Sequence, residues 1–335
     1  MRFVVYGAGA VGGVLGGRLA LSKNDVLLIC REPHARAINE NNGLKMKSAR
    51  GEYSATLRAA SDLAAGEVDD DTCILFTPKS HDTKLCVEKL SKLAPAGVSL
   101  VSFQNGVSNE EIISEKFTNV HGGVCRMTCS ALQPGQVSFR RMGRLVIGKY
   151  PKGSHSFPKK LAPILESAGF EVSVSNSIMC DKWLKLVVNL QSGFNAIVDS
   201  RDHDSVEFMD LKVGVLEEAK KVLKSEKMRA KSCDDRDLSV DDVIKELKKP
   251  KAPRSPSAVR VNNSTWQNLY LKRKEVENGY FHGPIIEIAK KHKIPVPFNE
   301  VALELVTECC KSKLGPGVFR AGEVLEKINL RGKDR

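Results

Sequence analysis

The sequence predicts an α/β fold, in which an N-terminal doubly wound sheet is followed by an all-helical C-terminal domain. Three observations support this prediction. A glycine-rich turn directly follows the first apolar segment, short apolar segments recur up to about residue 174, and the pattern becomes helical from about residue 177. The 335 residues suggest two domains, because a domain commonly spans about 150 residues. We expect the first domain at residues 1–176 and the second at residues 177–335.

The glycine-rich turn identifies the first domain as Rossmann-type. An apolar strand over residues 2–6 precedes it, and a helix of small residues over 13–21 and an apolar strand over 26–29 follow it. This order of strand, turn, helix and strand is typical of dinucleotide-binding units. The turn matches G-x-G-x-x-G and consists of Gly7, Ala8, Gly9, Ala10, Val11 and Gly12.

Each glycine of the turn has a separate physical reason. Gly7 allows the tight turn after the strand, Gly9 lets the backbone approach a diphosphate, and Gly12 lets the helix pack closely on the strand. The N-terminus of the helix offers unpaired N–H groups and a partial positive charge to an anion. The alternative is a glycine-rich turn that binds no ligand.

The end of the second strand bears on the choice of cofactor. Arg31 stands where a guanidinium would meet the 2′-phosphate of NADPH, whereas the next residue, Glu32, has a carboxylate that could bind the ribose of NAD instead. We expect NADPH. The alternative for Arg31 is a surface arginine paired with Glu32.

Polar side chains follow two further strands of the predicted sheet. Lys79 follows the strand at 71–77, and Asn105 follows the strand at 98–103. Ligands of doubly wound sheets gather at the carboxyl ends of the strands, so we expect both residues at the edge that holds the cofactor. The alternatives are an exposed lysine and an Asn-Gly turn. Further strands are expected near residues 122–128, 135–139, 144–147 and 171–174.

The second domain contains two groups of polar residues at helical spacing. Lys185 and Asn189 are four residues apart on a helix expected over 181–189, and Asn195 follows six residues later. Ser264 and Glu277 precede a helix expected over 284–292. Between the two groups, residues 225–260 are polar and rich in lysine, and we interpret them as a partly helical insertion with a flexible end.

Composition excludes several classes of protein. The hydrophobic fraction is 41%, and no apolar run is long enough to span a membrane. The net charge of +12 is spread along the chain, which favours small anionic ligands over nucleic acid. Nine cysteines, with no second pair at metal-ligand spacing, indicate free thiols in a reducing compartment. We therefore expect a cytoplasmic protein with no metal. The sequence allows a homodimer but does not fix the oligomeric state.

The motifs together resemble the ketopantoate reductase (2-dehydropantoate 2-reductase) family. The resemblance runs from residue 2 to about residue 306, with residues 225–260 as an insertion. It rests on the glycine turn, Arg31, Lys79, Gln104-Asn105-Gly106, the segment 185–189, Ser264-x-x-Gln267 and the segment 277–283. It implies a Rossmann domain followed by a helical domain, with the active site in the cleft. It also implies NADPH-dependent reduction of the 2-oxo acid 2-dehydropantoate to pantoate, in the route to coenzyme A.

The resemblance also implies roles for individual residues. Lys185 corresponds to the lysine that protonates the nascent alkoxide, and Glu277 corresponds to the glutamate of the late motif, with Glu275 as the rival. The other implied positions fall into two groups. Substrate-binding positions are Asn105, Asn189, Ser264 and, two residues displaced, Asn195; Lys79 corresponds to a lysine near both cofactor and substrate.

The late motif departs from the family pattern. Asn278 and Gly279 stand where the family has an apolar residue and Asp, His282 stands where it has Asn, and Asn268 replaces an acidic residue. Two other functions therefore remain open. One is a related NAD(P)H-dependent reductase of another 2-oxo acid or an imine, and the other is a dinucleotide-binding sensor without turnover.

Overall fold

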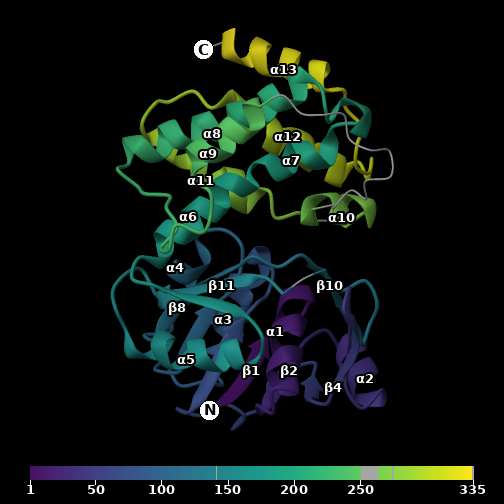
Figure 1. Cartoon of the computed structure of the whole chain (residues 1–335), viewed down its shortest axis with the longest axis vertical. Coiled ribbons are helices and arrows are strands. Elements are labelled where there is room, and N and C mark those ends of the chain that lie inside the picture. Colours follow the sequence, from purple (N-terminus) through teal and green to yellow (C-terminus); the bar gives the residue numbers. More distant parts are fainter. Residues whose placement is uncertain (141, 250–262, 274, 334–335) are drawn as a thin grey trace. The chain divides into compact units, whose positions relative to one another are not determined.

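The computed structural model describes residues 1–140, 142–249, 263–273 and 275–333 (Figure 1). The expected flexible end of the insertion lies largely at 250–260, outside the described residues. The described chain forms two compact units, Met1–Lys182 and Trp183–Arg335. The limit between these units falls inside helix α6 (Ile178–Asn189).

The first unit is built on an eight-stranded sheet with strand order β12-β11-β8-β7-β6-β1-β2-β5. The six strands from β5 to β8 are parallel, β11 pairs antiparallel with β8, and β12 pairs parallel with β11. The predicted doubly wound sheet is thus confirmed. Its strands are β1 (Arg2–Tyr6), β2 (Val26–Ile29), β5 (Arg58–Ala60), β6 (Thr72–Phe76), β7 (Ser99–Ser102), β8 (Val120–Cys125), β11 (Arg144–Lys149) and β12 (Glu171–Ser175).

Alternate residues of the central strands point to opposite faces of this sheet, and each face is covered by its own core. In β1, Phe3 and Val5 belong to one core, whereas Val4 and Tyr6 belong to the other. All four are buried, which explains why the strand appears in the sequence as a continuous apolar run. The helices of this unit are α1 (Ala10–Leu21), α2 (Glu32–Glu40), α3 (Thr83–Leu90), α4 (Asn109–Ser114) and α5 (Ser156–Ser167), with a short 3₁₀ helix, η1 (Ser80–Asp82).

A second, four-stranded sheet lies beside helix α1. The sequence predicted one of its strands, near 135–139, but not that a separate sheet forms. Its order is β4-β3-β10-β9, and β10 pairs parallel with β3 although about 90 residues separate them. The pairing is therefore invisible to a local pattern. The strands are β3 (Leu44–Ser48), β4 (Gly51–Ala55), β9 (Cys129–Ser130) and β10 (Gln136–Phe139).

Helix α1 packs between the two sheets, and its four paired glycines make this packing possible. A Cβ added at Gly16 would collide with Leu28 and lie 3.0 Å from Val5, both on the large sheet. A Cβ at Gly17 would lie 2.5 Å from Met46 Sδ on the small sheet. One turn earlier, Gly12 likewise faces the large sheet and Gly13 faces the small sheet. The run Gly-Gly-x-x-Gly-Gly therefore serves two faces, not the single sheet face expected from the sequence.

The second unit is helical, as predicted. The helix expected over 284–292 begins earlier, at Gly279, because Pro284 is accommodated inside it instead of at its start. Helix α9 lies within the expected insertion, with Val240, Ile244 and Leu247 buried. Besides α6, the helices are α7 (Gln191–Ile197), α8 (Val206–Ser225), α9 (Val240–Lys248), α10 (Ser264–Tyr270), α11 (Gly279–Lys291), α12 (Pro297–Lys311) and α13 (Ala321–Lys333), with the 3₁₀ helix η2 (Ser200–Asp202).

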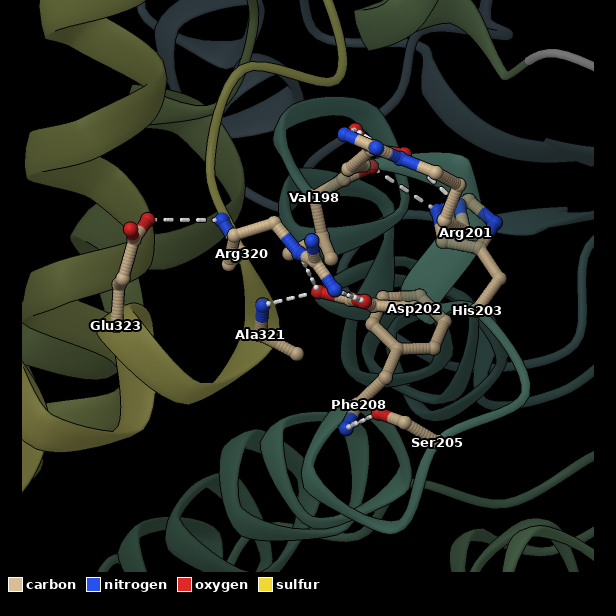
Figure 2. A network of polar contacts seen from close by, with 10 residues as sticks. Val198, Arg201, Asp202, His203, Ser205, Phe208, Arg320, Ala321 and Glu323 are labelled. Atoms are coloured by element: carbon tan, nitrogen blue, oxygen red, sulfur yellow. Dashed lines mark hydrogen bonds and ion pairs between the residues drawn. The ribbon is translucent and has the colours of Figure 1, made fainter.

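A polar network attaches the start of α13 to the segment that follows α7 (Figure 2). Arg320 Nε donates to Asp202 Oδ2 at 2.8 Å, and the backbone N–H of Ala321 donates to the same oxygen at 2.8 Å. The hydrogen bond from Arg320 holds the pKa of Asp202 below its ordinary value. A parallel bridge between Val198 and Phe319 adjoins the network. The C-terminal helix is thus tied to the rest of its unit by specific polar contacts.

The close packing of α1 predicts the effect of one substitution. Gly16→Ala should lower the free energy of unfolding by about 1–3 kcal/mol, because the added methyl group overpacks the contact with Leu28 and Val5. Urea denaturation measures this change. Gly97→Ala is the matched control, since a Cβ there would meet no atom within 4 Å. Equal stability of the two variants would contradict the close packing of α1.

Candidate functional site

The glycine turn after β1 has the geometry that the motif predicts. Gly7 adopts φ +87°, and a Cβ there would lie 2.5 Å from the backbone nitrogen of Pro78. The backbone N–H of Gly7 and of Ala8 both donate to the carbonyl of Ile29, at 2.9 and 2.8 Å. Gly12 faces Thr77 and Val5, where a side chain would collide. The roles expected for Gly7 and Gly12 thus have visible steric causes inside the protein.

Gly9 differs from its neighbours in a way that points to a ligand. A Cβ at Gly9 would have no atom closer than 4.0 Å, so protein packing does not require glycine there. Gly9 is exposed, helix α1 has no side-chain cap, and no acidic residue lies in its first turn. The first N–H groups of an α-helix have no intrahelical partner, so at this end of α1 they are available to a ligand. This site fits the diphosphate of a dinucleotide.

The strand ends that carry the candidate residues lie side by side. Tyr6 pairs with Phe76, and Phe76 pairs with Ser102, so β1, β6 and β7 end in register. The loops that follow them contain Gly7, Lys79 and Asn105 respectively. The structure therefore brings these three residues to one edge of the sheet. Lys79 is exposed and Asn105 is half-buried.

A buried hydrogen-bond network joins the loops that carry Lys79 and Asn105. The Gln104 side chain donates to the Pro78 carbonyl at 3.0 Å and to Thr83 Oγ1 at 2.7 Å. Asn109 Nδ2 donates to the Asn105 carbonyl at 2.8 Å, and Thr83 Oγ1 donates to Asn109 Oδ1 at 2.8 Å. Sequence reasoning did not single out Thr83 or Asn109, since polar residues in the first turn of a helix are usually exposed. Their burial is visible only in the fold.

Arg31 lies on the next strand end, after β2. It is exposed, and it precedes the first turn of α2. The neighbouring Glu32 forms an exposed ion pair with Arg36, one helical turn later, at 3.6 Å. Arg31 and Glu32 are the two groups expected to compete for the cofactor ribose. Of these, Glu32 is already paired with a guanidinium on its own helix.

The candidate residues of the second unit lie on three helices and one turn. Lys185 and Asn189 are both half-buried on α6, and Asn195 is half-buried on α7. Ser264 is exposed as the first residue of α10. Glu277 lies in the turn before α11 and is 6% exposed, whereas its rival Glu275 is exposed.

The elements that carry Ser264 and Glu277 are joined through their neighbours in the chain. Thr265 Oγ1 donates to Asn278 Oδ1 at 3.0 Å, and both residues are buried. Asn263 caps α10 by accepting from the Trp266 N–H and donates to the Ser192 carbonyl on α7 at 3.0 Å. Neighbouring residues, to which sequence reasoning gave no positioning role, therefore hold Ser264 and Glu277 in place.

His282 is fully buried behind this turn, and its hydrogen bonds define its tautomer. Asn299 Nδ2 donates to Glu218 Oε2 at 2.8 Å, so Asn299 Oδ1 is the acceptor for His282 Nδ1 at 2.9 Å. His282 Nδ1 therefore carries the proton. Burial lowers the pKa of His282 to about 4. The ring is neutral at pH 7 and serves as a fixed donor inside the helical unit.

Metal-ligating and membrane-spanning features are absent from the described part of the chain. Among these residues, no cluster of three or more His, Cys, Asp or Glu side chains could hold a metal ion. None of the described helices is both long and apolar enough to cross a bilayer. All nine cysteines are free thiols.

Two family models together match most of the chain. The model described as "Ketopantoate reductase PanE/ApbA" matches residues 3–152, and its C-terminal counterpart matches residues 177–309. The chain belongs to the ketopantoate reductase family. It is therefore a 2-dehydropantoate 2-reductase-like oxidoreductase, and the nicotinamide dinucleotides are the cofactor class of this family.

Several relatives in the ketopantoate reductase family are distant but match over nearly their full length. The 2-dehydropantoate 2-reductase of Pyrococcus horikoshii is 28% identical over 95% of this chain and 99% of its own. A ketopantoate reductase structure from Ralstonia eutropha is 26% identical, covers 94% of this chain and 100% of its own, and has a TM-score of 0.79. D-mandelate dehydrogenase with NADH and anilino(oxo)acetate shares the fold, at 24% identity over 94% and 100% of the two chains and a TM-score of 0.79.

The open position at Gly9 predicts a change in binding without a change in stability. Gly9→Ala should leave the unfolding midpoint unchanged but weaken NADPH binding by about tenfold or more, because the methyl group would occupy the space of the diphosphate. Fluorescence titration measures the dissociation constant. Gly16→Ala is the control, because it should lower stability but not weaken NADPH binding. Wild-type affinity in the Gly9 variant would remove the turn from the cofactor site.

The buried neutral His282 predicts sensitivity to acid. Its pKa is lower in the folded chain than the ordinary 6.5, so the unfolded chain binds more protons between pH 6.5 and 4. As the pH is lowered from 6.5 to 4, this residue should therefore lower the free energy of unfolding by about 3 kcal/mol. His282→Asn should remove that share of the slope. Urea denaturation at pH 7 and pH 4.5 compares the two proteins, and identical slopes would disprove the assignment.

Proposed function

We propose that this protein catalyses the NADPH-dependent reduction of 2-dehydropantoate to (R)-pantoate, a step of pantothenate and coenzyme A biosynthesis. The observation that carries the cofactor half of this proposal is the open glycine turn at Gly9. The substrate half is supported by family membership and by the full-length match to 2-dehydropantoate 2-reductases.

The proposed cofactor site uses the strand-end edge of the first unit. The backbone of residues 7–12 binds the diphosphate, and Lys79 and Asn105 contribute from the two neighbouring loops. Arg31 binds the 2′-phosphate, and the ion pair of Glu32 with Arg36 reduces the repulsion that the carboxylate would exert on that phosphate. These charges favour NADPH over NADH.

The proposed chemistry assigns one proton transfer to the chain. When bound, NADPH would supply a hydride to the carbonyl carbon, and negative charge would develop on the carbonyl oxygen. Lys185 donates a proton to that oxygen as the general acid. Glu277 orients the lysine or the substrate hydroxyl, and its burial favours it over the exposed Glu275. The proposed substrate-binding residues are Asn105, Asn189, Asn195 and Ser264.

A related reductase of another 2-oxo acid or an imine is the second candidate. His282 replaces the asparagine usual in the family, and it lies behind the turn that carries Glu277. The shared fold with D-mandelate dehydrogenase, a protein bound to anilino(oxo)acetate, supports a different acid. A sensor without turnover is the third candidate. A cytoplasmic location and a homodimer are further proposals. Light scattering, which measures the molecular mass in solution, tests for the homodimer.

The central experiment follows NADPH absorbance when 2-dehydropantoate is added. We expect oxidation of NADPH, a lower rate with NADH, and a fall in turnover of about 10²-fold or more in Lys185→Ala, with NADPH binding retained. Lys220→Ala, an exposed lysine on α8, is the matched control. Near-normal turnover in Lys185→Ala would remove the lysine from the acid role. Oxidation only with other 2-oxo acids or imines would establish the second candidate.

A further inference from the structure

A buried ion pair lies in the first unit, outside the residues proposed for cofactor and substrate. It joins Lys182, on the first half of α6, to Glu110 on α4, and the exposed fractions of the two side chains are 2% and 0%. Burying two charges costs several kcal/mol per ion, and such a pair often adds no stability over apolar residues of similar volume. Stability alone is therefore a weak reason for this pair.

The pair also contacts the loop that carries Asn105. Lys182 Nζ donates to the Gln104 carbonyl oxygen at 3.3 Å, so it holds the peptide group that links Gln104 to Asn105. The next peptide group is held from the other side, because the Asn105 carbonyl accepts from Asn109 Nδ2 at 2.8 Å and from Ser80 Oγ at 3.2 Å. The backbone on both sides of the Asn105 side chain is thus fixed by buried donors.

The start of α6 fits closely against the sheet at this point. A Cβ at Gly122, on β8, would lie 2.9 Å from Ile178 Cγ1 and 3.5 Å from Lys182 Cδ. The glycine therefore lets α6 approach the strand, and the aliphatic part of Lys182 passes over it. The ammonium group is delivered to one place, between the Gln104 carbonyl and the Glu110 carboxylate.

We propose that Lys182 and Glu110 are positioning residues for Asn105. Glu110 fixes the ammonium group, Lys182 fixes the Gln104–Asn105 peptide, and the Asn105 side chain is thereby directed toward cofactor and substrate. This inference rests on the proposed function, in which Asn105 contacts both. An apolar pair would fill the same space, but it would not donate to the Gln104 carbonyl.

The test uses the double variant Lys182→Met/Glu110→Gln, which removes both charges and approximately keeps the volume. We expect a folded protein whose NADPH dissociation constant rises by no more than about threefold, because the unchanged glycine turn still binds the diphosphate and only the contact from Asn105 is weakened. The kcat/KM for 2-dehydropantoate should fall by about tenfold or more. The NMR signal of the Asn105 side-chain amide, assigned with Asn105→Asp, should move from its wild-type position with and without NADPH.

The outcomes separate positioning from a structural role. An Asn105 signal and kcat/KM equal to wild type in the folded double variant would overturn the proposal. If the double variant does not fold, the single variants decide. Glu110→Gln keeps the donor to Gln104 and should leave the Asn105 signal closer to wild type than Lys182→Met does; equal displacement in both overturns the proposal. If wild type does not reduce 2-dehydropantoate, the proposed function fails, and the NMR comparison still decides the positioning role.

Discussion

The structure depends most on the close packing of helix α1 between two sheets. This packing requires glycine on two faces of one helix, with Gly16 against the large sheet and Gly17 against the small one. It holds the N-terminus of α1 at the end of β1, where Gly9 leaves an open position. Steric requirements inside the protein explain the other glycines of the turn and of α1, but not Gly9. A ligand that approaches the backbone explains it, and this distinction carries the cofactor assignment.

Buried polar contacts hold the loops at the strand ends in place. Gln104 and Asn109 connect the loop of Lys79 to the loop of Asn105, and both use their side chains for contacts within the protein. The same principle holds in the helical unit, where the Thr265–Asn278 hydrogen bond lies directly behind Ser264 and Glu277. Each candidate residue on these loops and turns follows or precedes a residue that is locked in place.

Sequence reasoning predicted the parts of the fold that depend on local pattern. The central strands, the glycine turn and the helical second half each leave a short-range signal, and all three are confirmed. The small sheet was missed as a separate sheet, because its parallel pair joins β3 to β10 across about 90 residues of the first unit. Thr83, Asn109 and Lys182 were missed for a related reason: a polar residue near a helix start is normally exposed, and only tertiary contacts bury it. The roles of Lys185 and Glu277 stay predictions.

The central claim is that the turn at Gly9 and the N-terminus of α1 hold the diphosphate of NADPH. A crystal structure of the protein with NADPH tests it most directly. We expect diphosphate oxygens within hydrogen-bond distance of the backbone N–H groups of residues 10–12, the Gly9 Cα in van der Waals contact with them, and the 2′-phosphate beside Arg31. A dinucleotide bound elsewhere, with the turn empty, would contradict this claim.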